Sequence, residues 1–251
     1  LKRVHRPEYV DLIFEHAPTQ GYAQLDPDTA MNPYSMNAAL RGVGAAIAAT
    51  DAVMAGELQN AFCAVRPPGH HAFAELAGGF CYLNNSGIAA QRLTDAGRRV
   101  AILDVDLHHG NGTQGMFYDR GDVLTVSIHA DPERFYPFFW GYADEYGAGE
   151  GMVANLNLPL PRGTADEGFM AALGTALEKI DSWGADSLVL ALGLDAFEGD
   201  PFAGLGVSTN GFARIGRAVA DMGLPTTIIQ EGGYLCPELG RNLAAVLGAF
   251  A

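Results

Sequence analysis

The sequence predicts an α/β fold in which an open parallel sheet is covered by helices on both faces, as a single domain over residues 1–251. Short apolar segments rich in branched residues alternate with longer helical segments, an order typical of parallel sheets. The apolar segments are nearly continuous, as in strands buried on both faces. With 251 residues, of which 49% are hydrophobic, the chain is long enough for one sizeable core.

The elements follow from the chain in order. Residues 36–56 are Ala-rich and read as a helix, the apolar strand after it ends at the prolines of "RPPGHHA", and the next helix is closed by Gly97. "RRVAILDVD" is a strand rich in branched residues. The predicted helices are 36–56, 84–97, 169–183, 209–222 and 237–250, and the predicted strands are 61–65, 98–106, 122–129, 186–193 and 225–233.

Charge limits the classes of partner. The formal net charge is −14, and only Lys2 and Lys179 among the basic residues are lysines. Such a field repels nucleic acid and favours a cationic substrate. Acidity that merely keeps the chain in solution explains the same charge equally well, so both interpretations stay open.

Other whole-chain features point to a cytoplasmic protein. Cys63, Cys81 and Cys236 are odd in number and lack CxxC spacing, which argues against a disulfide framework or a thiolate zinc site. No apolar run approaches the ~18 residues that a membrane helix needs, and nothing reads as a signal peptide. The opening "LKRVHRPEYV" reads as the interior of a longer chain.

Unusual polar clusters occur at the predicted strand ends. They are His70-His71, the stretch from Asp104 to Asn111, Asp195, and the stretch from Glu231 to Tyr234. Because sites in parallel sheets form outside the carboxyl ends of the strands, these four clusters are expected to meet at one edge. Within "ILDVDLHHGNGTQ", the residues Asp104, Asp106 and His108 are spaced by two, so extended backbone would project them to one side.

Two of these clusters contain candidate metal ligands. Three protein ligands with an open position are the pattern of a catalytic metal site, and Asp106, His108 and Asp195 supply them. Carboxylate and imidazole suit zinc, Fe(II) or Mn(II), so the ion stays open. The alternatives are a capped loop with solvated acids and, for Asp195, an ordinary strand-end aspartate. Asp200 before Pro201 reads as a turn former.

The tandem histidines suggest proton transfer beside a metal. His70 and His71 lie on a Pro-rich loop, and Asp104 and Asn111 are candidate partners that would fix their tautomers. The Tyr234 phenol could donate a hydrogen bond to a developing oxyanion, although a half-buried tyrosine would look the same. The sequence contains no GxSxG elbow, P-loop or GxGxxG motif that would indicate another class of active site. Cys81 could be a nucleophile near the histidines, but we interpret it as a small buried residue.

Taken in order, "RPPGHHA", "GGFCYLNN", "ILDVDLHHGNGTQ", "SIHAD", "GLDAFEGDP" and "EGGY" resemble the histone deacetylase superfamily, whose fold is the arginase-like open α/β sheet. The resemblance runs from about residue 4 to the end, and the family's N-terminal strand and early loop are not visible. It implies that Asp106, His108 and Asp195 hold zinc, with Fe(II) as the other option. It also implies that His71 is the general base and acid and that His70, paired with Asp104, acts electrostatically.

The same resemblance assigns further residues. Tyr234 matches the transition-state tyrosine, and Asn111, at a position where some members have Asp, resembles the class II branch. Gly79, Phe80 and Tyr136 match the acyl-lysine tunnel, with Phe135 adjacent to Tyr136. A structural potassium site would use backbone oxygens of three residues around the metal together with two residues of the next strand. These five are Asp104, Asp106, His108, Ser127 and Ile128.

The implied reaction is amide hydrolysis, with small acylated amines as substrates. "SIHADPERFYPFFWGYADEYGAGEG" and "NLNLPLPRGT" look most like bacterial acetylpolyamine amidohydrolases, although the long insertion those enzymes carry before the region of "LDPDTAMNP" is replaced by "FEHAPTQGYAQ". A wider mouth would admit acyl-lysine, so a class II-type protein deacetylase is the alternative. A non-catalytic metal-dependent binding module and an arginase-like dimanganese hydrolase are rivals, and a homo-oligomer stays open.

Overall fold

A computed structural model describes all 251 residues and contains the predicted parallel sheet. Six parallel strands lie in the order β3-β8-β7-β4-β5-β6. Their bounds are β3 Asn60–Cys63, β4 Val100–Asp104, β5 Val123–Ala130, β6 Asn155–Leu160, β7 Ser187–Leu192 and β8 Thr226–Gln230. The α/β prediction is confirmed, and all six carboxyl ends lie at the same edge because every strand pair is parallel.

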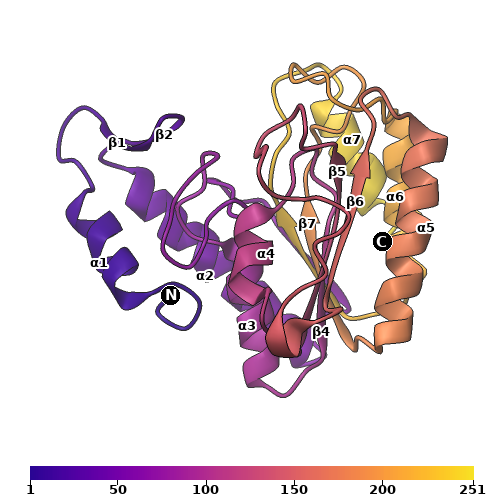
Figure 1. Ribbon diagram of the computed structural model, residues 1–251, viewed down its shortest axis with the longest axis horizontal. Coiled ribbons are helices and arrows are strands. Elements are labelled where there is room, and N and C mark those ends of the chain that lie inside the picture. The colour runs from indigo at the N-terminus through magenta and orange to yellow at the C-terminus, as the bar shows by residue number, and fades with distance from the viewer.

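Helices cover both faces of this sheet (Figure 1). Helices α2 (Ser35–Met54), α3 (Asn85–Asp95) and α4 (Asn111–Phe117) lie on one side, and α5 (Asp166–Trp183) and α6 (Thr209–Ala220) lie on the other, with α7 (Leu239–Leu247) packed on α6. None of the helices combines the length and apolar character that crossing a membrane requires.

The strands are buried on both faces, which explains their continuous apolar character. In β4, Ala101 and Leu103 belong to a core of 25 residues shared with α5, α6 and α7. Val100 and Ile102 belong to the opposite core of 12 residues, shared with α2, α3 and α4. Successive side chains therefore enter different cores, as the two-residue period of a strand requires.

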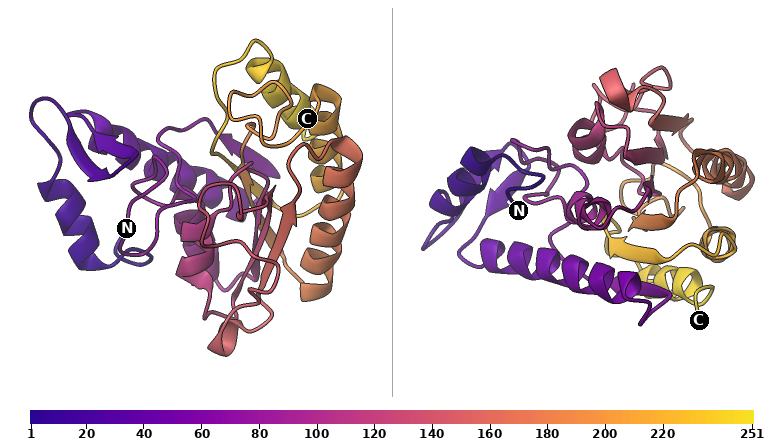
Figure 2. Two further views of the ribbon diagram at one scale, coloured as in Figure 1. Left: turned by 45° about the horizontal axis from the view of Figure 1, so that its top comes forward. Right: turned by 90° about the horizontal axis from the view of Figure 1, so that it is seen from below.

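The N-terminal region forms a smaller unit beside α2 that the sequence did not predict. It consists of α1 (Pro7–Glu15) and an antiparallel hairpin of β1 (Ala23–Asp26) and β2 (Thr29–Met31). Figures 1 and 2 show this unit set apart from the large sheet. A third core of 10 residues, which includes Ile13, Met31 and Leu83, joins it to α2 and to the segment before α3.

Candidate active site

The first part of the site is the turn that follows β4. Asp104 is the last residue of the strand, and the chain then turns, with the Asp106 amide donating to Asp104 Oδ1 (3.0 Å) and the His108 amide donating to Asp106 Oδ1 (2.8 Å). The expectation of extended backbone through His108 is therefore wrong, because these side chain-to-amide bonds stabilise a turn instead of a strand. The turn still brings Asp106 and His108 together.

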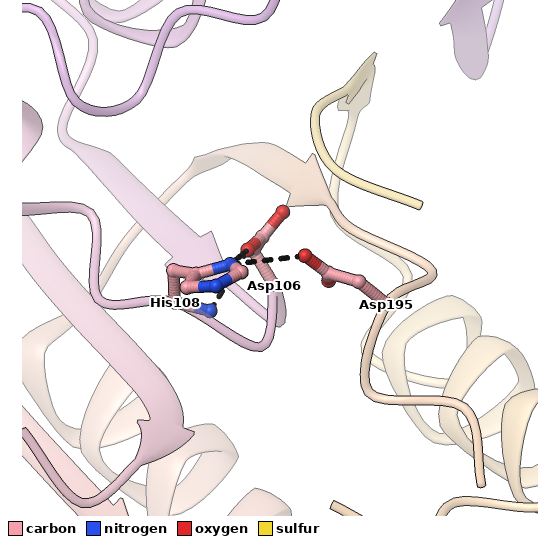
Figure 3. A group of neighbouring side chains, drawn as sticks. All are labelled: Asp106, His108 and Asp195. Carbon is pink, nitrogen blue, oxygen red and sulfur yellow. Dashed lines mark hydrogen bonds and ion pairs between the residues drawn. The ribbon is translucent and has the colours of Figure 1, made fainter. Parts of the chain in front are cut away.

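Asp195, from the loop after β7, completes a buried group with Asp106 and His108 (Figure 3). One ligand atom from each residue lies within 4.8 Å of the others. His108 Nδ1 is 3.3 Å from Asp106 Oδ1 and 3.1 Å from Asp195 Oδ2. Both carboxylates are fully buried, and backbone amides of Leu107 and Gly232 donate to Asp195 Oδ1 and Asp106 Oδ2. One oxygen of each carboxylate is thus held in place by a hydrogen bond from a backbone amide.

The electrostatics of this group fit a cation. Burial alone would lower the pKa of His108, but its hydrogen bonds to Asp106 and Asp195, and their charges, raise that pKa to about 10. Burial, and then the charge of Asp106, raises the pKa of Asp195 to about 6. No Lys or Arg side chain pairs with either carboxylate. Two buried carboxylates and one imidazole are the donor set of a divalent transition-metal site.

The tandem histidines are held by the two partners expected for them. His70 Nδ1 lies 2.9 Å from Asp104 Oδ2, and His71 Nδ1 lies 2.7 Å from Asn111 Oδ1. The carbonyl of Asn111 can only accept, so Nδ1 of His71 carries the proton and Nε2 keeps a free lone pair. Burial, followed by the charges of His70 and His108, lowers the pKa of His71 well below its usual value. His71 is therefore neutral, with Nε2 as its free acceptor.

The His71 ring also explains the glycine next to the tunnel. Gly79 has a left-handed backbone, and a Cβ at that position would collide with the His71 ring. Gly232 has a similar constraint, since a Cβ there would collide with the carboxylates of Asp106 and Asp195. The glycines of "GGF" and "EGGY" thus allow backbone to pack directly against the side chains of His71, Asp106 and Asp195.

A cavity of about 370 Å³ opens from these residues to the surface. Tyr136 lies edge-on to His71, with ring centroids 4.8 Å apart, whereas the adjacent Phe135 lines a different surface cavity. Tyr136 lines the cavity that contains His71 and His108, whereas the Phe135 ring packs near His108, with ring centroids 5.8 Å apart, from outside that lining. The cavity is lined by Asp28, His71, Gly79, Phe80, His108, Tyr136, Phe202 and Tyr234.

Tyr234 enters this cavity from the segment after β8. Its amide donates to Asp200 Oδ2 (3.0 Å), and the Phe202 amide donates to Asp200 Oδ1 (2.9 Å), so Asp200 is the turn residue expected from the sequence. The rings of Tyr234 and Phe202 are 4.5 Å apart. Burial, and then the charges of Asp106 and Asp195, raises the pKa of Tyr234, which keeps the phenol protonated.

The acidic turn of the β1–β2 hairpin was not predicted to be part of the site. Asp28 lines the cavity, and the charges of Asp28 and Asp26 both act on Tyr136. Asp26 fixes the turn, because its Oδ1 accepts from the amides of Asp28 and Thr29. Two acids around Pro27 in "LDPDT" were the available signal. Their position over the cavity depends on a hairpin that is too short to recognise by pattern.

The residues expected to hold potassium lie around the end of β4 and β5. Asp104 pairs in register with Ser127, and both line a small buried polar cavity on the side of α4. Ile128 is fully buried one residue further along β5. Two buried acceptors have no hydrogen-bond partner in this region, His109 Nδ1 and Asn157 Oδ1, and both residues line the same cavity.

Comparison with known proteins places the chain in a family. The model of the histone deacetylase domain matches residues 1–250. The acetylpolyamine amidohydrolase of Mycoplana ramosa is 44% identical over 92% of this chain and 68% of its own length, and that of Burkholderia pseudomallei is 45% identical over 90% and 66%. The chain thus spans about two thirds of the length of these relatives.

A solved structure supports the same assignment. The crystal structure of an acetylpolyamine aminohydrolase from Burkholderia pseudomallei superposes with a TM-score of 0.92 at 38% identity, covering 99% of this chain and 81% of the other. Both the fold and the sequence therefore lead to one conclusion. The chain belongs to the histone deacetylase family.

Proposed function

We propose that this chain is a metal-dependent deacetylase that hydrolyses the amide of small acylated amines, acetylpolyamines first. The observation that carries the proposal is the convergence of three kinds of group on one cavity. A buried Asp-His-Asp cation site, a neutral histidine with a free Nε2 and a protonated tyrosine all meet there. Amide hydrolysis needs each of these three functions.

Asp106, His108 and Asp195 are the residues that would hold the metal. Zinc suits three such ligands with an open coordination position, and Fe(II) accepts the same donors. When bound, the ion supplies Lewis acidity, which polarises the acyl carbonyl and makes a water molecule more acidic. The remaining steps belong to the side chains of the chain.

His71 is the proposed general base and acid. Its Nδ1–H is committed to Asn111, so Nε2 takes a proton from the attacking water as the new C–O bond forms. The same nitrogen then returns that proton to the amine nitrogen as the C–N bond breaks. The second proton of the attacking water passes from the new carboxylic acid to the amine, so the products are a carboxylate and an ammonium ion, and His71 ends neutral as it began.

Tyr234 and His70 stabilise charge during these steps. Tyr234 lines the same cavity, and its hydroxyl would donate a hydrogen bond to the oxygen of the acyl group as negative charge develops on it. Burial alone would lower the pKa of His70, but the charges of Asp104 and Asp106 raise it well above its usual value. A protonated His70 beside His71 would contribute positive charge without exchanging a proton in each turnover.

The preference for a cationic amine rests on the rim of the cavity. Asp28 lines the opening, and Asp26 lies in the same turn, so a substrate ammonium group leaving the tunnel would meet two carboxylates. The formal net charge of −14 acts in the same direction. The matched relatives from Mycoplana ramosa and Burkholderia pseudomallei are acetylpolyamine amidohydrolases, which also supports acetylpolyamines as substrates. A protein acyl-lysine is the alternative, since its tunnel portion would be chemically similar.

A structural potassium ion is part of the proposal. Backbone oxygens of Asp104, Asp106 and His108, together with Ser127 and Ile128, are the candidate ligands. The register pairing of Asp104 with Ser127 and the polar cavity that both line support this location. Potassium there would stabilise the turn after β4 and, through it, the two metal ligands that the turn carries.

The experiment that tests the function compares turnover of N-acetylputrescine and of an acetyl-lysine peptide by zinc-loaded protein, with metal content measured on the same sample. We expect one ion at the Asp-His-Asp group per chain and faster turnover of the diamine. Preference for the peptide would favour the protein deacetylase alternative. One bound metal with no turnover of either compound would contradict the deacetylase proposal, and two ions in the site would favour a dimetal hydrolase.

A further inference from the structure

The sequence "EGGY" contains a buried carboxylate that the proposed mechanism does not use. Glu231 is only 1% exposed and lies directly after β8, three residues before Tyr234. No Lys or Arg pairs with it in the structure, and it is not one of the group that could hold the metal. A buried glutamate that forms no salt bridge is costly, so its hydrogen bonds need an explanation.

Three donors converge on the Glu231 carboxylate. Oε2 accepts from the backbone amides of Gly69 (2.6 Å) and His70 (3.1 Å), and Oε1 accepts from the hydroxyl of Ser86 (2.9 Å). The first two donors belong to the loop that carries the tandem histidines. The third lies in the first turn of α3, where the positive end of the helix dipole favours negative charge.

The segment after β8 that carries Glu231 is hydrogen-bonded to the end of β7 and to Asp106, and it continues to Tyr234. The Glu231 amide donates to the Leu192 carbonyl at the end of β7, and the next amide, that of Gly232, donates to Asp106 Oδ2 (2.7 Å). Tyr234 follows two residues later. Glu231 therefore joins the segment bearing the tyrosine to the loop bearing the histidines, at a point where no strand pairing connects them.

We propose that Glu231 is a positioning residue, which holds the His70–His71 loop and the Tyr234 segment at a fixed relative placement. This inference rests on the proposed function, because it concerns the spacing of the general base and the tyrosine. A displacement of about 1 Å between catalytic groups is enough to cost about 100-fold in rate, even when it originates outside the reacting centre.

Two substitutions at Glu231 separate positioning from simple loss of a carboxylate. Glu231→Gln keeps the length and an acceptor oxygen for both amides, and its NH₂ can donate to Ser86 Oγ. Glu231→Met has similar length but no acceptor for the amides. With N-acetylputrescine, we expect Gln to keep kcat within about threefold of the wild type and Met to lower it by about 10- to 100-fold, with KM changed by less than about threefold.

The matched control is Asp186→Ala. Asp186 also accepts from one backbone amide, that of Arg99, and one serine hydroxyl, that of Ser187, but it lies at the amino ends of β4 and β7. Its loss should leave kcat unchanged. Ser86→Ala, which removes one of the three donors, should lower kcat by about threefold and keeps the proposal testable where Glu231→Met fails to fold.

Several outcomes would overturn this role. A folded, metal-loaded Glu231→Met protein with wild-type kcat would do so, and so would equal losses in Met and Gln, which would make charge and not hydrogen-bond geometry the cause. Where Met does not fold, an unchanged kcat in Ser86→Ala has the same meaning. Inactive wild-type protein would instead contradict the proposed function, so the two failures are distinguishable.

Discussion

The centre of the site and its rim differ in burial and in the hydrogen bonds that hold their side chains. At the centre, the side chains of Asp106, Asp195 and His71 are buried, and backbone amides or an asparagine fix each one. At the rim, Asp28 is exposed and belongs to a short hairpin outside the large sheet. Under the proposed function, the difference means that the chemistry depends on side chains held at the edge of the sheet, whereas the preference for a cationic substrate depends on the small N-terminal unit.

The largest effect should follow from removing a metal ligand at the centre. Asp195→Ala leaves His108 and Asp106 without the third donor, so we expect metal content to fall and turnover to drop by about a thousandfold or more, several kcal/mol of transition-state stabilisation. Metal analysis and initial rates measure both. Full metal occupancy with near wild-type rates would show that Asp195 is not a ligand.

A smaller loss should follow from removing a hydroxyl. Tyr234→Phe keeps the ring that packs on Phe202 and removes only the proposed oxyanion donor. We expect kcat to fall by about 10²- to 10³-fold, about 3–4 kcal/mol, with fold, metal content and KM nearly unchanged. Phe202→Leu, which alters the packing and keeps the hydroxyl, is the matched comparison. Near wild-type turnover in Tyr234→Phe would remove Tyr234 from the mechanism.

The rim should affect binding and not chemistry. Asp28→Asn removes one charge at the opening, so KM for N-acetylputrescine should rise by about three- to tenfold while kcat stays the same. Glu133→Gln, an acid that lines a different surface cavity, should leave both values unchanged. A fall in kcat with unchanged KM would mean that the hairpin acts on the centre and that the two regions are not independent.

The last expected effect concerns stability, and not activity, at the junction between the N-terminal unit and the site. Buried His5 bonds the Phe73 carbonyl through Nδ1 and accepts from the Asn84 amide at Nε2, and burial lowers its pKa to about 4. Between about pH 6.5 and 4 the unfolded chain therefore binds a proton that the folded chain does not. The free energy of unfolding should fall over that window by at most about 3 kcal/mol from this residue and level off below it.

Denaturant unfolding at a series of pH values measures this loss. His5→Gln keeps a donor for Phe73 and an acceptor for Asn84 but does not titrate, so its stability should fall less steeply over the same window. His16→Gln changes an exposed histidine next to α1 and is the matched control. Identical slopes for wild type and His5→Gln would contradict the linkage.

The sequence predicted the helices and strands whose residue pattern extends over enough positions to be recognised. Strands such as β7 are buried on both faces and are visible as apolar runs, and helices such as α5 are long. The elements not predicted are short or contain residues that weaken the pattern. The hairpin strands have four and three residues, α4 contains Gly112 and Gly115, and β6, an edge strand, contains Pro159.

The candidate site divides in the same way. Asp106, His108 and Asp195 follow buried strands, so parallel topology alone brings them to one edge. Asp28 reaches the cavity only through the packing of the hairpin, for which no local pattern exists. The hydrogen bonds of Glu231 to Gly69 and His70 join residues more than 160 positions apart, and they become visible only in three dimensions.

The most direct test compares metal-loaded wild-type protein on N-acetylputrescine and on N-pentylacetamide, in which a methyl group replaces the terminal ammonium. If the buried centre hydrolyses the amide and the acidic rim selects the cation, both compounds should be cleaved with similar kcat, and kcat/KM should favour the diamine by about tenfold or more at low salt. Equal kcat/KM values would contradict cation selection by the rim, and no cleavage of either compound would contradict the deacetylase itself.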